Sequence, residues 1–396
     1  MIQELTLPEI ATSDRHSMKR GPFGGALKKD IFVDEGYVVY EQQHAIYKRF
    51  NDVRYYIDES KYKELVAFKV EEGDLIISCS GTIGKIAEVP KGFKPGIINQ
   101  ALLKLTLDQS KVLNKYFIYL FEGEEIQNQL FNLSHGTGLK NFPPMSVVKS
   151  IKFPLPPLDQ QKKIAAILDA ADAYRQKTKA LIEKYDELTQ SLFLDMFGDP
   201  VRNPMRWKMV NFSDVGKLDR GKSKHRPRNA PELLGGIHPL IQTGNLANCG
   251  VYLKEYTSTY SDIGLAQSKK WPSGTLCITI AANIAKTGIL TFDACFPDSV
   301  VGFIPNQKTN NLYTLFWLSF LQKILEETAP ESAQKNINLG ILRALDFPLP
   351  PIELQNQFAE RVQAIEVQKA QAQASLAQAE DLFNSLLQKA FKGELS

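Results

Sequence analysis

The alternation of apolar and polar positions between residues 153 and 199 predicts one long helix. The segment opens with the Pro-rich elbow Phe153-Pro154-Leu155-Pro156-Pro157, continues without Pro or Gly, and stops at Gly198-Asp199-Pro200. Apolar side chains recur at alternating spacings of three and four, interrupted only by Thr178, and they are Ile164, Ile167, Ala171, Tyr174, Leu181, Tyr185, Leu188 and Leu192. A seam of this kind indicates a partner helix.

The partner pattern lies in the same chain. The elbow recurs as Phe347-Pro348-Leu349-Pro350-Pro351, and a second helical pattern follows it as far as Phe391-Lys392-Gly393. The second seam has Lys369 as its one polar member and otherwise comprises Val362, Ile365, Ala372, Leu376, Ala379, Phe383, Leu386 and Ala390. A helix of about 35 residues is roughly 50 Å long. Two such helices, once paired, would hold other parts of the chain apart.

The segments that precede the two helices also repeat. Residues 73–78 (GDLIIS) are matched by residues 274–279 (GTLCIT), and an aromatic-rich helical pattern follows in both copies. We therefore predict a tandem duplication of a unit about 195 residues long. The predicted segments are a first globule at 1–152, a first helix at 153–199, a second globule at 200–346 and a second helix at 347–396. The fold class is α+β, with two mixed α/β globules, an antiparallel pair of long helices between them, and a pseudo-twofold internal repeat.

Composition narrows the class of protein without naming it. A chain of 396 residues with 43% hydrophobic and 23% charged residues is typical of a globular protein of two or three domains, and a net charge of +3 does not by itself indicate nucleic acid. The four cysteines show no C-x-x-C spacing, so a reducing cytoplasm is expected. The N-terminus has no secretory pattern, and no segment approaches the roughly 20 apolar residues of a membrane span.

The residue groups that would mark an enzyme are incomplete. Gly81-Thr82-Ile83-Gly84-Lys85 is too short for a phosphate-binding loop. Asn141-Phe142-Pro143-Pro144 has the residue types of an adenine methyltransferase tetrad in the wrong order. Glu59-Ser60-Lys61 has the acidic and basic residues of a metal-dependent nuclease, but its surroundings predict an exposed helical turn. We therefore predict no catalytic residue, no metal site and no cofactor in this chain.

Two glycine-containing basic segments occupy similar places in the two globules. Residues 15–29 carry five basic residues and no acidic one, and residues 217–228 (KLDRGKSKHRPR) carry six Lys or Arg with a single Asp. Glycine and basic residues together allow a loop to follow a phosphate backbone. A solvated basic loop is the alternative for each segment taken alone, but the recurrence in both copies favours binding to nucleic acid.

Side chains suited to base edges follow the basic segments. Gln and Asn can pair with adenine in the major groove, and Arg or Lys with guanine. In the first globule the candidates for DNA contact are Lys19, Arg20, Lys28, Lys29, Gln42, Gln43, His44, Lys48, Ser80, Thr82, Lys85 and Lys140. In the second they are Arg220, Lys222, Lys224, Arg226, Arg228, Gln242, Thr243, Asn245, Lys286, Lys335 and Asn336. For the individual Gln and Asn residues, surface or turn roles stay open.

The chain resembles the specificity (S) subunits of type I restriction-modification systems along essentially its whole length. The resemblance is strongest in the two F-P-L-P-P-[LI]-[DE] elbows with their helices, in residues 21–28 (GPFGGALK) and in residues 73–85 (GDLIISCSGTIGK). The second globule matches more loosely, since Ala281-Ala282-Asn283 stands where the first has Ser80-Gly81-Thr82. The DNA sequence that is read is therefore not predicted.

The resemblance implies two target-recognition domains that each read half of a bipartite site in double-stranded DNA, with the long helices setting the spacing between the halves. It also implies that the helices and elbows dock two modification subunits, which bind S-adenosylmethionine and methylate adenine, and that motor-nuclease restriction subunits join them. The S subunit itself would be non-catalytic. The alternatives are a scaffold whose helices serve protein assembly only, or a stand-alone methyltransferase or nuclease.

Overall fold

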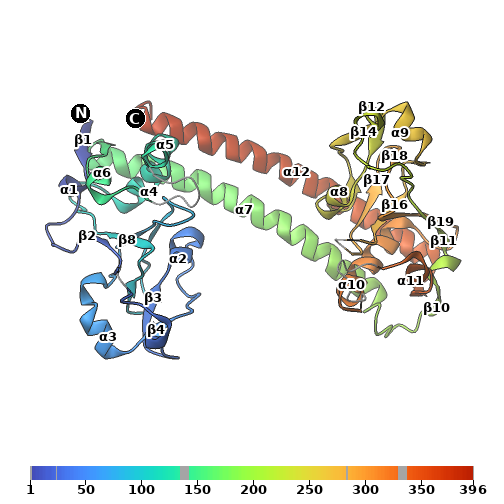
Figure 1. The fold of residues 1–396 in the computed structure, drawn as a ribbon, viewed down its shortest axis with the longest axis horizontal. Coiled ribbons are helices and arrows are strands. Elements are labelled where there is room, and N and C mark those ends of the chain that lie inside the picture. The colour runs from blue at the N-terminus through green and yellow to red at the C-terminus, as the bar shows by residue number, and fades with distance from the viewer. Residues whose placement is uncertain (1, 24, 134–141, 282–283, 329–336, 396) are drawn as a thin grey trace. The chain divides into compact units, whose positions relative to one another are not determined.

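The computed structural model describes residues 2–23, 25–133, 142–281, 284–328 and 337–395 (Figure 1). The chain forms two compact units: unit 1 comprises Met1–Thr178 and Ser375–Ser396, and unit 2 comprises Lys179–Ala374. The long helices α7 (Leu158–Phe197) and α12 (Ile352–Phe391) each contribute one part to each unit. Each unit therefore combines one of the predicted globules with segments of both helices.

The described strands of unit 1 form three sheets, which short helices join. The four-stranded antiparallel sheet has the order β2 (Met18–Arg20), β8 (Leu102–Leu105), β5 (Leu75–Ser78) and β6 (Ile86–Glu88). The three-stranded sheet has the order β4 (Tyr56–Ile57), β3 (Tyr37–Tyr40) and β7 (Gly96–Ile98), and β1 (Gln3–Thr6) pairs with β9 (Lys152–Leu155). The helices are α1 (Leu7–Ile10), α2 (Gln42–Tyr47), α3 (Glu59–Glu64), α4 (Asn114–Glu122), α5 (Glu124–Asn132) and α6 (Met145–Val148), with 3-10 turns at Lys29–Ile31 and Val66–Phe68.

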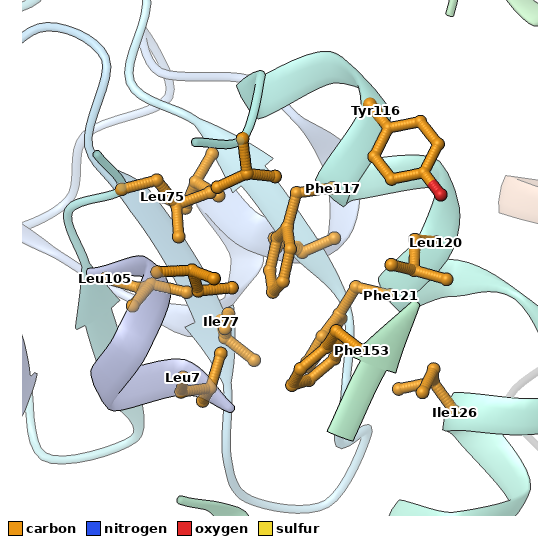
Figure 2. Packing of buried hydrophobic residues seen from close by; sticks show 14 of the residues in the cluster. Leu7, Leu75, Ile77, Leu105, Tyr116, Phe117, Leu120, Phe121, Ile126 and Phe153 are labelled. Atoms are coloured by element: carbon orange, nitrogen blue, oxygen red, sulfur yellow. The ribbon is translucent and has the colours of Figure 1, made fainter. Parts of the chain in front are cut away.

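The main core of unit 1 lies between the four-stranded sheet and helix α4. Leu75 and Ile77 on β5 and Leu105 on β8 point toward Phe117 and other apolar residues of α4 (Figure 2). The three strand residues share one face of the sheet, because side chains alternate between the faces of a strand, and all four side chains are fully buried. Burial of this apolar surface fixes α4, and with it the segment that leads into the helix, on the sheet.

Unit 2 repeats this architecture with additional strands. Its five-stranded sheet has the order β11 (Gly216–Arg220), β19 (Val300–Pro305), β16 (Leu276–Thr279), β17 (Thr287–Leu290) and β13 (Tyr252–Leu253). A four-stranded sheet has the order β14 (Ser258–Tyr260), β12 (Leu234–Leu240), β18 (Ala294–Cys295) and β15 (Lys270–Trp271), and β10 (Lys208–Asn211) pairs with β20 (Asp346–Leu349). The helices are α8 (Thr243–Ala247), α9 (Asp262–Ala266), α10 (Asn311–Thr328) and α11 (Leu339–Arg343), with 3-10 turns at Phe212–Asp214 and Pro231–Leu233.

The first half of each Pro-rich elbow is a strand, which the sequence pattern did not predict. Phe153 lies opposite Leu5 in the antiparallel pair β1–β9, and Phe347 lies opposite Val210 in β10–β20. Proline is compatible with such a two-stranded sheet because both strands are edge strands. The elbow therefore closes each globule by joining its last segment to its first.

The two long helices run antiparallel within each unit. In unit 1, the Gln160 amide of α7 donates to the carbonyl of Leu395, just after α12, at 3.4 Å, and the Arg175 guanidinium lies 4.3 Å from the centre of the Phe383 ring of α12. In unit 2, the rings of Phe193 and Phe358 lie 5.6 Å apart, and Lys369 forms an ion pair with Asp186. Residue numbers that rise along one helix therefore fall along the other, as predicted for an antiparallel pair.

The predicted seam positions differ in burial between the two helices. The predicted α12 positions, Lys369 included, are buried or half-buried. On α7, the positions Ile164, Ala171, Tyr185 and Leu192 are also buried or half-buried, as is the interrupting Thr178.

Four predicted seam residues of α7 instead face solvent: Ile167, Tyr174, Leu181 and Leu188, which are 39%, 54%, 43% and 50% exposed. The positions that complete the seam lie one residue later, at Leu168, Arg175, Ile182 and Thr189. Polar residues occupy part of the observed seam. The hydrophobic pattern therefore favoured the more apolar positions one residue earlier, which lie on the solvent-facing side of the helix.

Candidate nucleic-acid interface

Strand ends that carry predicted contact residues converge in unit 1. The Gly21 N–H donates to the Leu102 carbonyl at 2.9 Å, the Cys79 N–H to the Ala101 carbonyl at 2.8 Å, and the Asn99 N–H to the Tyr40 carbonyl at 2.9 Å. These bonds bring together residues 20–21, 40–42, 79–80 and 99–102, which we name the unit 1 rim. Arg20, Gln42 and Ser80 lie on it.

Unit 2 joins the corresponding strand ends, although the N–H donor of its third bond lies on the first strand of the pair rather than on the second. The Gly221 N–H donates to the Val300 carbonyl at 2.9 Å, the Ile280 N–H to the Ser299 carbonyl at 3.0 Å, and the Ile241 N–H to the Cys295 carbonyl at 2.8 Å. The unit 2 rim therefore comprises residues 220–221, 240–242, 280–281 and 295–300. Arg220 and Gln242 occupy on it the places that Arg20 and Gln42 occupy in unit 1.

A glycine follows the arginine in both rims because two backbone segments cross closely there. A Cβ atom on Gly21 would lie 1.8 Å from the Asn99 carbonyl oxygen, and one on Gly221 would lie 2.2 Å from the Phe296 carbonyl oxygen. No side chain fits at these distances. The Arg-Gly pair thus has a steric reason at the same place in both copies.

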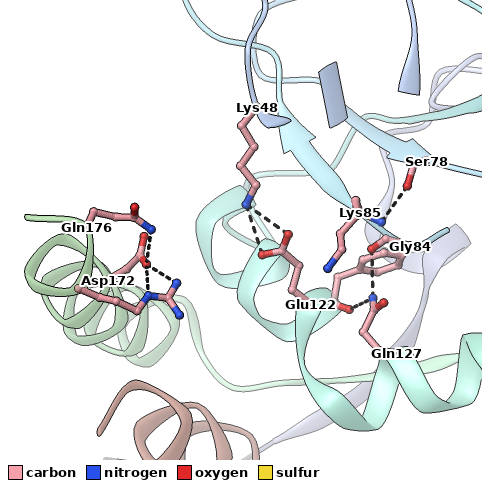
Figure 3. A network of polar contacts seen from close by, with 10 residues as sticks. Lys48, Ser78, Gly84, Lys85, Glu122, Gln127, Asp172 and Gln176 are labelled. Atoms are coloured by element: carbon pink, nitrogen blue, oxygen red, sulfur yellow. Dashed lines mark hydrogen bonds and ion pairs between the residues drawn. The ribbon is translucent and has the colours of Figure 1, made fainter. Parts of the chain in front are cut away.

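A hairpin tip borders each rim and is held by the same hydrogen bond. The Lys85 N–H donates to Ser78 Oγ at 3.0 Å, and the Lys286 N–H donates to Thr279 Oγ1 at 3.0 Å. In unit 1, Gln127 also donates to the Gly84 carbonyl at 3.1 Å (Figure 3).

In the unit 1 hairpin, Thr82 and Lys85 are exposed and Ser80 is half-buried. In the unit 2 hairpin, Lys286 is half-buried. The Phe142 N–H donates to the Cys79 carbonyl, which places residue 142 at the hairpin base. The predicted contacts Lys140, Lys335 and Asn336 lie outside the described residues.

The basic segment of unit 2 is an ordered loop rather than a loose one. Gln267 Oε1 accepts from the backbone N–H groups of Lys224 at 2.6 Å and His225 at 3.1 Å. The Ser268 hydroxyl donates to the Lys222 carbonyl at 2.8 Å, and Arg226 donates to the Ser223 carbonyl at 2.7 Å.

Charge in this loop is only partly balanced. Arg228 and Arg226 lie 2.6 Å and 3.9 Å from Asp298 carboxylate oxygens, whereas Lys222 and Lys224 extend from the loop as exposed side chains. The loop therefore presents a net positive surface on a fixed backbone.

The basic residues of unit 1 are divided between two elements. Lys19 and Arg20 lie on strand β2, where the Lys19 ammonium is 5.1 Å from the centre of the Phe68 ring. Lys28 and Lys29 are exposed at the start of the 3-10 turn that ends at Ile31. The sequence pattern predicted one basic loop here, and the strand divides it.

Two predicted base-reading side chains act as helix caps. His44 is fully buried, and its Nδ1 accepts from the Glu41 N–H at 2.9 Å at the start of α2. Burial lowers the pKa of His44, so the ring is neutral at physiological pH. Asn245 has the equivalent place on α8, where its Oδ1 accepts from the Gln242 N–H at 2.9 Å. His44 therefore cannot contact DNA in this conformation, and the cap restricts Asn245.

The remaining candidates near α2 and α8 differ in availability. Gln43 donates to the Asp52 carbonyl at 3.1 Å, and Lys48 forms an ion pair with Glu122 at 3.2 Å (Figure 3). Gln242 is exposed and Thr243 half-buried. A polar residue at the third position of a helix can cap the N-terminus of that helix. This sequence signal would have predicted the cap roles of His44 and Asn245.

The potential metal ligands and the cysteine thiols of the described residues do not form a further site. None of their His, Cys, Asp and Glu side chains form a group of three or more that could hold a metal ion. Burial raises the pKa of the Cys79 thiol to about 12 and that of Cys249 to about 11. Within the same part of the chain, no helix is long and apolar enough to cross a membrane.

The fold and the rims together define a tandemly duplicated α/β protein with matching basic and amide-bearing surfaces, the features of a nucleic-acid-binding protein. The family described as "Type I restriction modification DNA specificity domain" matches residues 24–185 and again residues 204–378. The chain belongs to this family and carries two copies of its domain. It is a DNA specificity subunit with two recognition domains, the non-catalytic part of a type I system.

Individual relatives are similar along most of their length. The putative type I restriction enzyme MjaX specificity subunit of Methanocaldococcus jannaschii is 23% identical over 328 residues, which cover 78% of this chain and 76% of the relative. The EcoBI specificity subunit of Escherichia coli is 24% identical over 341 residues, covering 76% and 70%. The fold is similar to that of a type I S subunit from M. genitalium, with a TM-score of 0.58, 16% identity and coverage of 99% and 96%. It is also similar to a chain from a study of complex assembly and conformational transition of the type I R-M system, with a TM-score of 0.61, 18% identity and coverage of 100% and 98%.

Proposed function

We propose that the two rims each read one half of a bipartite site in double-stranded DNA, with residues 1–152 and 200–346 as the two target-recognition domains. The observation that carries this proposal is the repetition of the rim: backbone bonds between corresponding strand ends bring together the segments that carry Arg20 and Gln42 in one unit and Arg220 and Gln242 in the other. The side chains around these shared positions differ between the units. A kept scaffold with altered side chains fits two domains that read different short sequences.

The candidate contacts divide by chemistry. Exposed Lys and Arg side chains on or beside the rims suit phosphate contacts, which position the protein without reading sequence. Amide and hydroxyl side chains such as Gln42, Gln242 and Thr82 suit base edges. His44 is left out of the proposed interface because it is buried.

The proposal is tested by first mapping methylated adenines in the host genome with and without this gene. Duplexes carrying the mapped site are then used in gel shifts with the modification subunits present. Binding that requires both half-sites and weakens with salt supports the proposal. Binding indifferent to sequence and salt would instead favour the rival in which the chain is an assembly scaffold only. Methyl transfer or cleavage by this chain alone would favour a stand-alone enzyme.

Docking of two modification subunits, and through them of restriction subunits in the cytoplasm, is the second part of the proposal. It is supported by the four exposed apolar residues of α7: Ile167, Tyr174, Leu181 and Leu188. Residues seven apart lie on one side of a helix, so these side chains form an apolar stripe beside the seam. An exposed stripe of this kind suits a partner helix.

The docking proposal predicts that Tyr174→Ser lowers retention of the modification subunits in a pull-down. Val367→Ser on α12, which is 65% exposed and outside the stripe, is the matched control. Equal retention in both variants would argue against the stripe as the docking surface.

A further inference from the structure

The second turn of each long helix carries a glutamine whose side chain is completely buried. In unit 1 this is Gln161, with 0% exposure. Its Oε1 accepts from the Leu113 N–H at 3.0 Å, and its Nε2 donates to the Lys111 carbonyl at 2.9 Å and the Pro156 carbonyl at 2.8 Å. One amide group therefore joins the elbow to the loop that precedes α4.

Unit 2 repeats these three bonds and adds a fourth. Gln355 is also 0% exposed, and its Oε1 accepts from the Asn310 N–H at 3.2 Å and from the Thr309 hydroxyl at 2.7 Å. Its Nε2 donates to the Lys308 carbonyl at 3.1 Å and the Pro350 carbonyl at 2.9 Å. The contact is thus built twice in one chain, between globules whose recognition side chains differ.

A buried tyrosine makes a second hydrogen bond to each elbow. The Tyr116 hydroxyl donates to the Pro154 carbonyl at 2.9 Å, and the Tyr313 hydroxyl donates to the Pro348 carbonyl at 2.7 Å. We name the pairs Gln161 with Tyr116 and Gln355 with Tyr313 the elbow junctions.

The junction geometry leaves little freedom between globule and helix. A reversed amide would face carbonyl oxygens with its own oxygen, so only one orientation of each glutamine satisfies all its partners. Each broken bond would leave a polar group buried without a partner, which is costly. The loop partners of Gln161 lead directly into α4, and α4 packs on the sheet that carries the rim. The junction therefore acts together with the buried α7 residues Ile164, Ala165 and Leu168 to fix the angle between the rim and the long helix within unit 1.

We propose that the elbow junctions are positioning elements that restrict the spacing between the two half-sites that the protein accepts. This inference rests on the proposed bipartite reading. One added base pair moves a half-site by about 3.4 Å and turns it by about one tenth of a helical turn. A globule that can tilt on its helix would accommodate such a change, whereas a globule held by the junction would not.

The test compares Gln161→Leu and Gln355→Leu with wild type in the complete complex with modification subunits. The substrates are duplexes with both native half-sites and with spacers one base pair shorter than, equal to and one base pair longer than the native spacer. Because a misplacement of about 1 Å can cost about a hundredfold in rate, wild type should methylate the native spacer far faster than its neighbours. In the variants the ratio of native to neighbouring spacers should fall by about tenfold or more, with both half-sites still required.

Asn114→Leu is the matched control. Asn114 is buried and makes the same number of bonds as Gln161: it accepts from Gln109, and it donates to the Gly73 carbonyl and to Glu88. All of these partners lie within the globule, and none lies on the elbow or on α7. Loss of stability alone should lower its methylation of all three duplexes equally.

Two outcomes overturn the inference. The first is a Gln variant whose rates fall equally on all three spacers, as in Asn114→Leu. The second outcome applies if the Gln variants fail to fold, in which case the milder double variant Tyr116→Phe with Tyr313→Phe is measured instead. If this double variant methylates native and neighbouring spacers in the same ratio as wild type, the inference is refuted. If wild type itself accepts every spacer or a single half-site, the proposed bipartite function fails instead.

Discussion

Two exposed lysines in the basic loop of unit 2, Lys222 and Lys224, provide a direct measure of how this domain holds DNA. Their backbone is fixed by Gln267 and Ser268, so replacing both side chains with alanine should leave the fold intact. If each lysine neutralises one phosphate, the slope of log affinity against log salt should become shallower by about 0.9 per contact, or about 1.8 in total. Between about 50 and 200 mM salt, the affinity advantage of wild type over the double variant should then shrink by about tenfold.

The assay is a fluorescence anisotropy titration with the modification subunits present, at several salt concentrations. It uses one duplex with the native target and one with the half-site of unit 2 scrambled. Phosphate contacts predict the same change of slope on both duplexes, since they do not read sequence. Asp298→Asn is a control of opposite sign: it frees Arg226 and Arg228 and should steepen the slope by about 0.9 for each of the two that then contacts a phosphate, up to about 1.8. An unchanged slope in the double variant, or weakening on the native duplex alone, would refute the assignment of these lysines to phosphates.

Three further outcomes are expected. Leu168→Ala should lower the free energy of unfolding by about 2–5 kcal/mol, because the Leu168 side chain is fully buried. Replacing the adjacent, exposed Ile167 with alanine should change the free energy of unfolding by about 1 kcal/mol or less. Denaturant titration measures both effects, and equal effects would contradict the corrected seam. Inserting about one turn, four residues, at matched positions of both long helices should change the preferred spacer and leave the half-sites unchanged in methylation assays; an unchanged spacer would show that helix length does not set it. Burial raises the pKa of Glu366 in the folded protein, and the nearby Asp186 carboxylate adds to this shift. Ionised Glu366 therefore lowers the free energy of unfolding at pH values above its folded-state pKa. This destabilisation disappears as the pH falls below the ordinary carboxyl pKa. Glu366→Gln should therefore raise Tm near pH 7.5 and change it much less near pH 4; a gain that is constant with pH would exclude titration of Glu366 as the cause.

The helices show why hydrophobic pattern predicts some surfaces and not others. On α12 the seam is apolar apart from Lys369, so the most apolar set of positions is also the buried set. On α7 the seam includes Arg175 and Thr189. These residues are more polar than Tyr174 and Leu188 one position earlier, so the hydrophobic pattern predicts the earlier positions instead. Arg175 is accommodated because its guanidinium stacks on Phe383, and Thr189 because its hydroxyl donates to the Tyr185 carbonyl at 2.9 Å. Such contacts depend on the folded partner and leave no periodic signal.

The rims were predictable in their residues but not in their assembly. Arg20, Gln42 and Ser80 are far apart in sequence, and the bonds that bring their strand ends together join backbone groups, which carry no residue-type signal. The pairing of each elbow strand was missed for a related reason: proline argued for a turn, and only the edge position of the strand makes it compatible with a sheet. The cap role of His44 could have been inferred, since a polar side chain three residues after a helix start is a local signal.

The strand pairs β1–β9 and β10–β20 place the first and last segments of each globule side by side. A segment whose two ends are neighbours can be exchanged as a whole, because the rest of the chain needs only the same two attachment points. A single crossover between related genes at the coding sequence of the first elbow, residues 153–157, would therefore replace the first proposed reading domain and leave both long helices in place. A host lineage can in this way acquire a new combination of half-sites in a single genetic event, without passing through intermediates that read neither.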